Sequence, residues 1–164
     1  MELKSRKRNR KEGFDYSSEQ IYFVTICTHE KTHDFGYVKN GCIILNKNGK
    51  IAEDQIRWLE EQHSYVSLHN AVVMPNHVHI LFGIDVKYIF AETKIKSVSE
   101  LIGAYKTTTS KLIHLSGNTE FKWQRSFHDH IVRDAYGYEN IYRYISENPV
   151  RWKMDVHNII EINN

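Results

Sequence analysis

The sequence is poor in cysteine and proline and contains no long apolar run. Only two of its 164 residues are cysteines and two are prolines. Its longest apolar stretches read IYFVTIC and HVHILF, far below the roughly 20 residues that span a bilayer, and no apolar segment follows the basic start. With 41% hydrophobic and 26% charged residues, the composition is that of a globular protein. We therefore expect one cytoplasmic domain and no membrane partner.

The two cysteines exclude a site built on thiolates. Cys27 and Cys42 lack the short spacing of metal-binding cysteines, and a single disulfide is expected only in an oxidising compartment. We expect both to be reduced core residues.

Positive charge is concentrated at the N-terminus. Residues 1–11 carry a net charge of +5, whereas the remaining residues carry −3. Such a cluster can neutralise phosphates and release their counterions, although a solvated arm is an equally good interpretation. We expect an arm at residues 1–16 and one domain at 17–164. The predicted phosphate-binding residues of the arm are Lys4, Arg6, Lys7, Arg8, Arg10 and Lys11.

Strand and helix patterns alternate along the rest of the chain without an internal repeat. A capping box, Ser97 with Glu100, opens one helix, and Asp134 is placed to cap another. This order predicts an α+β fold, an antiparallel sheet with helices packed on one face, as in ferredoxin-like or RNA-recognition domains. Strands are predicted at 22–28, 42–46, about 68–74, 77–83 and 125–134, and helices at about 46–62, 97–117 and 135–148.

His77 and His79 stand two residues apart in the apolar stretch VVMPNHVHILF. Side chains at positions i and i+2 of a strand share one face, so the two imidazoles lie side by side. Neutral imidazole is the commonest metal ligand in proteins. On its own, such a pair is more often the polar face of a half-exposed strand.

The last predicted helix offers partners for a metal. Tyr144 and Asn148 are four residues apart and share a helical face. An amide oxygen suits Mg²⁺ or Mn²⁺, and a phenol beside it is a candidate nucleophile. Tyr138 and Tyr142 share a different face. Pro149 follows Asn148 and disfavours a helical backbone at that residue, which leaves the direction of the Asn148 side chain open.

Five blocks of the sequence resemble a known family. His77-Val78-His79 resembles the histidine pair of HUH endonucleases, and Tyr144 resembles the nucleophile of their single-tyrosine branch. The best resemblance is to REP-associated tyrosine transposases, relatives of the insertion-sequence transposases of the two-hundred type. The blocks occur in the family order: FDYSSEQIYFVTICT, VVMPNHVHILF, GAYKTTTSKLI, WQRSFHDHIVRD and RYISENPVRW.

The resemblance implies an HUH endonuclease fold and a DNA transposase that acts on hairpin-forming single-stranded DNA. His77, His79 and Asn148 would hold one divalent ion, Mg²⁺ or Mn²⁺. Tyr144 would attack the scissile phosphate and form a 5′-phosphotyrosyl intermediate. A monomer or homodimer associated with the nucleoid is expected. The family more often has acidic residues where this chain has Gly137.

Other candidate residues carry weaker signals. Lys106 and Lys111 on the middle helix could contact DNA phosphates, although exposed lysines are usually only solvated. Trp123, Gln124 and Arg125 could stack on or read a base, and core packing explains Trp123 equally well. A second pair, His128 and His130, is separated by Asp129 rather than an apolar residue, so we rank it below the first.

Two alternatives remain open from the sequence. One is a regulator that binds DNA hairpins without cleaving them, and the other is a metal-dependent phosphohydrolase that uses water as its nucleophile.

Overall fold

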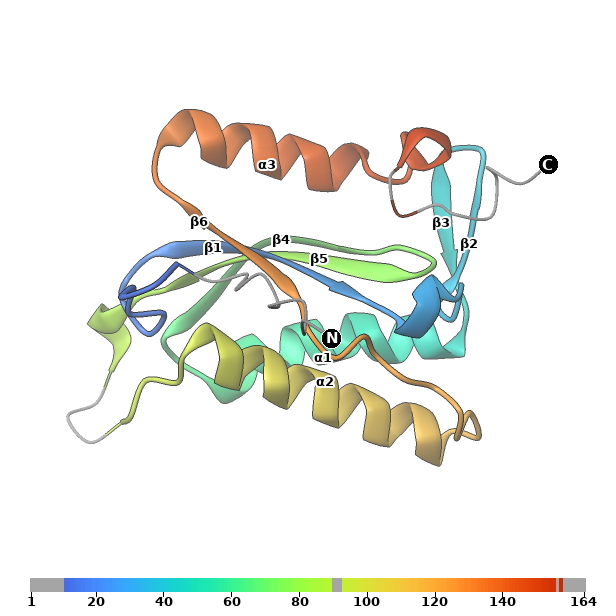
Figure 1. Ribbon diagram of the computed structural model, residues 1–164, viewed down its shortest axis with the longest axis horizontal. Helices are drawn as coiled ribbons and strands as arrows, with labels where there is room; N and C mark the ends of the chain where they lie inside the picture. Colours follow the sequence, from blue (N-terminus) through green and yellow to red (C-terminus); the bar gives the residue numbers. More distant parts are fainter. Residues whose placement is uncertain (1–10, 90–92, 156, 158–164) are drawn as a thin grey trace, which may run out of the picture.

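A computed structural model describes residues 11–89, 93–155 and 157 (Figure 1). Its main sheet has four antiparallel strands in the order β4-β5-β1-β6, and β2 and β3 form a separate two-stranded ribbon. The strands are β1 (Ile21–Cys27), β2 (Gly36–Lys39), β3 (Cys42–Leu45), β4 (Val66–Val73), β5 (His77–Ile84) and β6 (His128–Val132). The helices are α1 (Lys47–Gln62), α2 (Val98–Leu115) and α3 (Ala135–Glu147), with 3-10 turns η1 (His29–Lys31), η2 (Val86–Tyr88) and η3 (Trp152–Met154). The predicted α+β class is confirmed.

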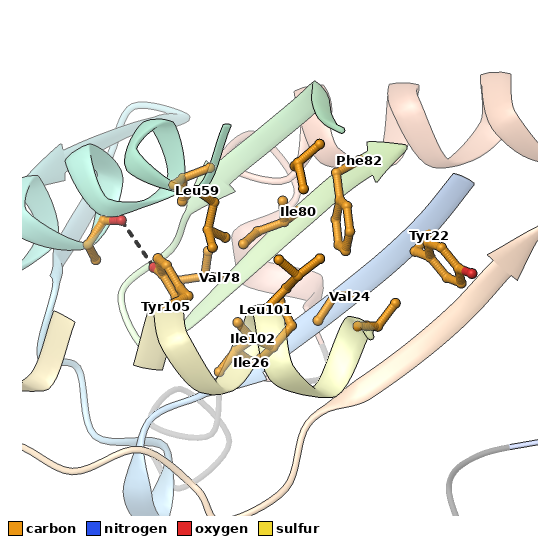
Figure 2. Packing of buried hydrophobic residues seen from close by; sticks show 14 of the residues in the cluster. Tyr22, Val24, Ile26, Leu59, Val78, Ile80, Phe82, Leu101, Ile102 and Tyr105 are labelled. Carbon is orange, nitrogen blue, oxygen red and sulfur yellow. Dashed lines mark hydrogen bonds between the residues drawn. The ribbon is translucent and has the colours of Figure 1, made fainter. Parts of the chain in front are cut away.

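One face of the sheet is covered by α1 and α2 (Figure 1). Alternate residues of β5, Val78, Ile80 and Phe82, point into a large buried apolar cluster between the sheet and these helices (Figure 2). The hydroxyl of Tyr105 donates to the Ala52 carbonyl of α1 at 3.1 Å, so the phenol is satisfied inside the cluster. This face contains most of the apolar core and fixes the strands that carry the site.

Helix α3 crosses the opposite face of the sheet (Figure 1). Its Ile145 packs with Leu81 of β5 and Val132 of β6 in a second, smaller cluster. The prediction that the helices lie on one face is therefore wrong. All eight residues of β5 are buried, and a strand buried on both faces requires a covering layer on each.

The predicted helix caps are confirmed. Ser97 and Glu100 make both hydrogen bonds of the capping box, and Asp134 accepts from the Gly137 amide at 2.6 Å. This bond stabilises the first turn of α3 despite the glycine, because it satisfies an amide that has no partner within the helix.

The ribbon turns at Asn40 and Gly41, which both have positive φ angles (53° and 74°), as a tight hairpin requires. Cys42 begins β3 and is exposed, whereas Cys27 is buried. The prediction of two core cysteines is thus wrong for Cys42, because the ribbon is not a strand of the main sheet. Nor does the predicted strand 125–134 form over its full length: β6 is an edge strand paired only with β1.

Residues 1–10 of the predicted arm lie outside the described residues, and the boundary after residue 16 stays a prediction. Among the described residues, Lys11 is exposed, and Phe14 and Tyr16 pack against the main core cluster. In residues 11–89, 93–155 and 157, no helix is both long and apolar enough to cross a bilayer.

Candidate active site

His77 and His79 face α3 from the middle of the sheet. They pair with Cys27 and Thr25 of β1, and their ring centroids lie 4.5 Å apart. Neither ring reaches solvent, since the residues are 0% and 1% exposed. The strand periodicity correctly placed them side by side, but the site is closed off rather than half-exposed.

Hydrogen bonds to Asn76 determine the proton position on His77. The Asn76 amide nitrogen donates to the carbonyls of Lys31 and His157, which leaves its Oδ1 facing Nδ1 of His77 at 2.9 Å. Because that oxygen can only accept, Nδ1 carries the proton and Nε2 keeps its lone pair. This role of Asn76 was not predicted from the sequence.

His79 is held on two sides. Its Nδ1 lies 2.8 Å from the Thr25 hydroxyl on β1, and its ring packs against Phe23 at 5.3 Å. These contacts direct Nε2 away from the strand, since the other nitrogen is engaged.

Asn148 ends α3 with its side chain buried beside His77 and Tyr144. Its backbone has φ −56° and ψ −43°, so Asn148 is helical although a proline follows it. Helical geometry at this residue carries the amide inward, because it keeps Asn148 on the same face of α3 as Tyr144.

Three buried polar atoms lack a hydrogen-bond partner at this point: Nε2 of His77, Nε2 of His79 and Oδ1 of Asn148. Buried acceptors are normally satisfied, so this trio fits a divalent ion that accepts one lone pair from each. Among the described residues, no three His, Cys, Asp or Glu side chains form a metal site by themselves. The amide is therefore needed to complete the set.

Both histidines are held neutral, as metal ligands must be. Burial, with a smaller contribution from the nearby His157, lowers the pKa of His79 to about 3. Burial also lowers the pKa of His77 well below its usual value, assisted by its neighbours His79 and His157.

The phenol of Tyr144 lies at the edge of this group. Its ring is 5.2 Å from that of His79 and 6.3 Å from that of Phe23, and the residue is 36% exposed. Burial raises the pKa of the phenol, and the negative charge of Asp155 adds to this. Tyr144 is thus a protonated hydroxyl, open to solvent, beside three unpartnered ligand atoms.

The neighbouring tyrosines point away, as the helical spacing predicts. The rings of Tyr138 and Tyr142 lie 6.1 Å apart, and the Tyr138 hydroxyl is 2.9 Å from Nδ1 of His69 on β4. Tyr142 is 43% exposed, and its carbonyl accepts from the Asn70 side chain. Of these three tyrosines, Tyr144 is the one beside the histidine pair.

Sequence reasoning missed two groups that follow α3. The Asp155 carboxylate Oδ2 lies 4.0 Å from Nε2 of His77, and the His157 ring lies 4.5 Å from the His77 ring. Burial lowers the pKa of His157. Neither residue belongs to a periodic pattern, and both follow turn η3.

The five other predicted DNA contacts gather in one open groove of about 740 Å³ beside α2. Lys106 and Lys111 line it from the helix, and Trp123, Gln124 and Arg125 line it from the segment before β6. Lys106 Nζ donates to the carbonyls of Gln124 and Arg125, and burial lowers its pKa. Its ammonium is thus already bonded within the protein.

Trp123 is partly buried and packs on the main core cluster. Its indole nitrogen donates to the Lys106 carbonyl at 3.2 Å. Trp123 thus lines the groove and also packs on the core. The sequence left open whether it stacks on a base or packs in the core, and the structure is compatible with both roles. The rival pair, His128 and His130, lies exposed on edge strand β6. His128 is opposite Thr25 in the ladder, and its charge adds to burial in lowering the pKa of His157.

Known proteins resemble the chain in both sequence and fold. An uncharacterized protein of Haemophilus influenzae is 29% identical, over 92% of this chain and 91% of its own length. A REP-associated tyrosine transposase bound to a REP hairpin has the same fold, with a TM-score of 0.58 and 17% identity over 87% of this chain and 72% of its own. A protein described as a transposase from Deinococcus radiodurans R1 matches with a TM-score of 0.52 and 16% identity over 84% of this chain and 96% of its own. The model of the family "Transposase IS200 like" matches residues 44–148, which is more than half of the sequence, and the chain therefore belongs to the IS200-like transposases.

Proposed function

We propose that this transposase cleaves and rejoins single-stranded DNA through a covalent bond between Tyr144 and a 5′-phosphate. The observation that carries the proposal is the convergence of three unpartnered buried atoms, on His77, His79 and Asn148, beside the Tyr144 phenol. A nucleophile next to a ready set of metal ligands is an arrangement suited to covalent, metal-assisted phosphoryl transfer.

His77, His79 and Asn148 would hold one Mg²⁺ or Mn²⁺ ion. When bound, the ion would polarise the phosphoryl oxygens and orient the phosphate for in-line attack. Oxygen and imidazole ligands without a thiolate favour such hard ions. The Asn76 side chain would keep His77 in the tautomer that offers Nε2 to the ion.

Tyr144 would supply the attacking oxygen. As the phenol oxygen bonds to phosphorus and loses its proton to solvent, the bond from phosphorus to the 3′-oxygen breaks, and the 3′-oxygen takes up a proton from solvent and leaves as a 3′-hydroxyl. Burial raises the pKa of the phenol, so proton removal must accompany attack. The tyrosyl ester conserves the energy of the broken bond, and a 3′-hydroxyl can attack it in the return step without an external energy source.

The DNA partner we propose is a single strand that folds into a hairpin, because the fold relative above was solved with a REP hairpin. Lys111 and Arg125 of the groove, with the basic residues of the arm, would contact phosphates. Such contacts position the strand without reading its sequence. We further propose that residues 1–16 act as this arm, next to one domain at 17–164, in a nucleoid-associated monomer or homodimer.

The test uses labelled single-stranded oligonucleotides taken from the DNA that flanks the gene of this protein. With Mn²⁺ or Mg²⁺ we expect a shortened product and a protein-DNA adduct that survives a denaturing gel. With EDTA both should disappear. Binding of the oligonucleotide without any cleavage would instead identify a hairpin-binding regulator. Cleavage without an adduct would identify a phosphohydrolase that uses water.

A further inference from the structure

A hollow of about 460 Å³ lies between the two-stranded ribbon and the segment that follows α3. Tyr37 and Val38 line it from β2, and Trp152 and Lys153 line it from η3. Cavities that bind small organic groups measure about 300–1,000 Å³. The hollow is therefore large enough for a nucleobase, and none of these four residues has a part in the proposed cleavage step.

The hollow adjoins the candidate active site along the chain. Pro75 and Pro149 both line it. Pro75 stands two residues before His77, and Pro149 directly follows Asn148. A group held in the hollow is thus close to the residues that would position the reacting phosphate.

Ring contacts show which side of the site the hollow adjoins. The Trp152 ring lies 6.0 Å from the His77 ring, with their planes 30° apart. The Tyr144 ring lies beside His79 instead, at 5.2 Å. Because the hollow and the attacking phenol adjoin different members of the histidine pair, the hollow has the place of a nucleotide next to the scissile phosphate.

The walls of the hollow suit an unpaired base. Tyr37 is 57% exposed, so much of its ring is open to a ligand. Trp152 is 6% exposed and packs 5.5 Å from the His33 ring, which makes it a fixed wall. Bases stack on aromatic side chains whatever their identity, because every base has a π-face. None of the ten described residues that line the hollow is acidic, and Lys153 adds a positive charge.

Packing within the protein accounts for Trp152 but not for Tyr37. Trp152 lies between other rings, whereas the Tyr37 side chain has no hydrogen bond or ring contact among the described residues. An exposed aromatic side chain that lines a hollow beside a reaction site is suited to contact a ligand.

We infer that the hollow holds an unpaired base of the DNA strand, stacked on Tyr37 beside the wall formed by Trp152. This inference rests on the proposed function, which brings a single strand to the site. Bases of a strand without a complement are free to stack on aromatic side chains. Lys153 would contact a backbone phosphate of the same strand.

The test measures binding of single-stranded oligonucleotides from the DNA that flanks the gene, in EDTA so that the strand stays uncut. An abasic site replaces each base in turn, and fluorescence anisotropy gives the affinity. We expect one abasic position whose effect depends on Tyr37. In the unchanged protein it should weaken binding about fivefold or more, because the stack is lost. In Tyr37→Ala the same abasic site should weaken binding less than twofold further.

Two variants serve as controls. Tyr37→Phe keeps the aromatic ring and should retain the abasic profile of the unchanged protein. Tyr136→Ala removes another exposed tyrosine, 79% exposed at the start of α3, and should retain it as well. Because Tyr37 is exposed, Tyr37→Ala should also keep the Tm of the unchanged protein.

Photochemical crosslinking locates the base directly. An oligonucleotide with 5-iodouracil at the sensitive position is irradiated with the unchanged protein, and mass spectrometry identifies the modified residue. Attachment to Tyr37 or Trp152 supports the inference. Attachment to Trp123 would place the base in the groove beside α2 and refute it.

The outcomes separate this inference from the proposed function. If Tyr37→Ala keeps the full abasic profile, the base site is refuted, whereas cleavage and the adduct formed by Tyr144 can still stand. If the unchanged protein gives no cleavage or adduct with Mn²⁺ but the position that depends on Tyr37 remains, the base site stands and the proposed chemistry is wrong.

Discussion

The two faces of the main sheet use the same strands for different purposes. On the face covered by α1 and α2, β5 contributes Val78, Ile80 and Phe82 to a continuous apolar core. On the face crossed by α3, the alternate positions hold His77, His79 and Leu81, and three buried polar atoms lack partners. The first face stabilises the strands. The second face is less stabilising, because it buries polar atoms without hydrogen-bond partners, and we propose that an ion binds them. This division yields predictions in which the two faces respond differently.

The largest expected effect separates two tyrosines on α3. Tyr144→Phe should reduce cleavage and adduct formation by a factor on the order of 10³ or more, because the attacking oxygen is lost. Tyr142→Phe should retain both, since the Tyr142 ring lies against that of Tyr138 and not beside the pair His77 and His79. Denaturing gels with labelled oligonucleotide measure the adduct. An adduct that survives in Tyr144→Phe and vanishes in Tyr142→Phe would reverse the assignment.

Substitutions at two adjacent residues of β5 should affect different properties, cleavage in one case and the free energy of unfolding in the other. His79→Ala should abolish Mn²⁺-dependent cleavage while hairpin binding changes little, because the residue faces the proposed ion. Ile80→Ala should lower the free energy of unfolding by about 2–5 kcal/mol and leave Mn²⁺ affinity of the folded protein unchanged, since Ile80 is fully buried in the opposite cluster. Urea unfolding and calorimetry measure the two quantities. If both variants altered both quantities alike, the division between the faces would be wrong.

The stability of the metal-free protein should fall as pH falls below about 6.5. Folding lowers the pKa of both His77 and His79, so the unfolded chain binds the extra protons. Above about pH 6.5 the rings are neutral in both states and contribute no slope. Between about pH 6.5 and the lowered pKa of the folded state, each histidine contributes up to about 1.4 kcal/mol per pH unit.

Urea unfolding in EDTA at pH 7 and pH 5.5 tests this slope. A variant with glutamine at both histidines should show a flatter dependence. Ile80→Ala should be less stable at each pH but keep the slope of the unchanged protein. An equally steep slope in the glutamine variant would place the titration elsewhere.

The smallest effects concern DNA phosphates. Deleting residues 1–11 should flatten the log-log dependence of DNA affinity on salt by several units, at about 0.7 per lost phosphate contact on single strands. Lys111→Ala should remove about one such contact, because Lys111 lines the groove beside α2. Binding titrations at several salt concentrations measure both. If Lys111→Ala left the slope unchanged, Lys111 would not contact a phosphate, and the layer formed by α1 and α2 would contribute to stability alone.

Local features of the sequence determined much of the molecule. The capping residues Ser97 and Asp134 marked two helix starts, since a cap acts within three residues of itself. The alternation at His77 and His79 placed them on one strand face, and the spacing of Tyr144 and Asn148 placed these on one helix face. These features depend on backbone periodicity alone, and each is present in the structure.

Tertiary structure alone decided which faces meet. Nothing in the periodicity of α3 said that it would cross the sheet opposite α1 and α2, because that choice follows from the place of β6 at the sheet edge. The helical backbone of Asn148, the exposure of Cys42 and the approach of Asp155 to His77 likewise depend on segments distant in the chain. Local patterns specify where a side chain lies on its own element, whereas packing between elements, which lowers the free energy only once the chain has folded, specifies what that side chain faces.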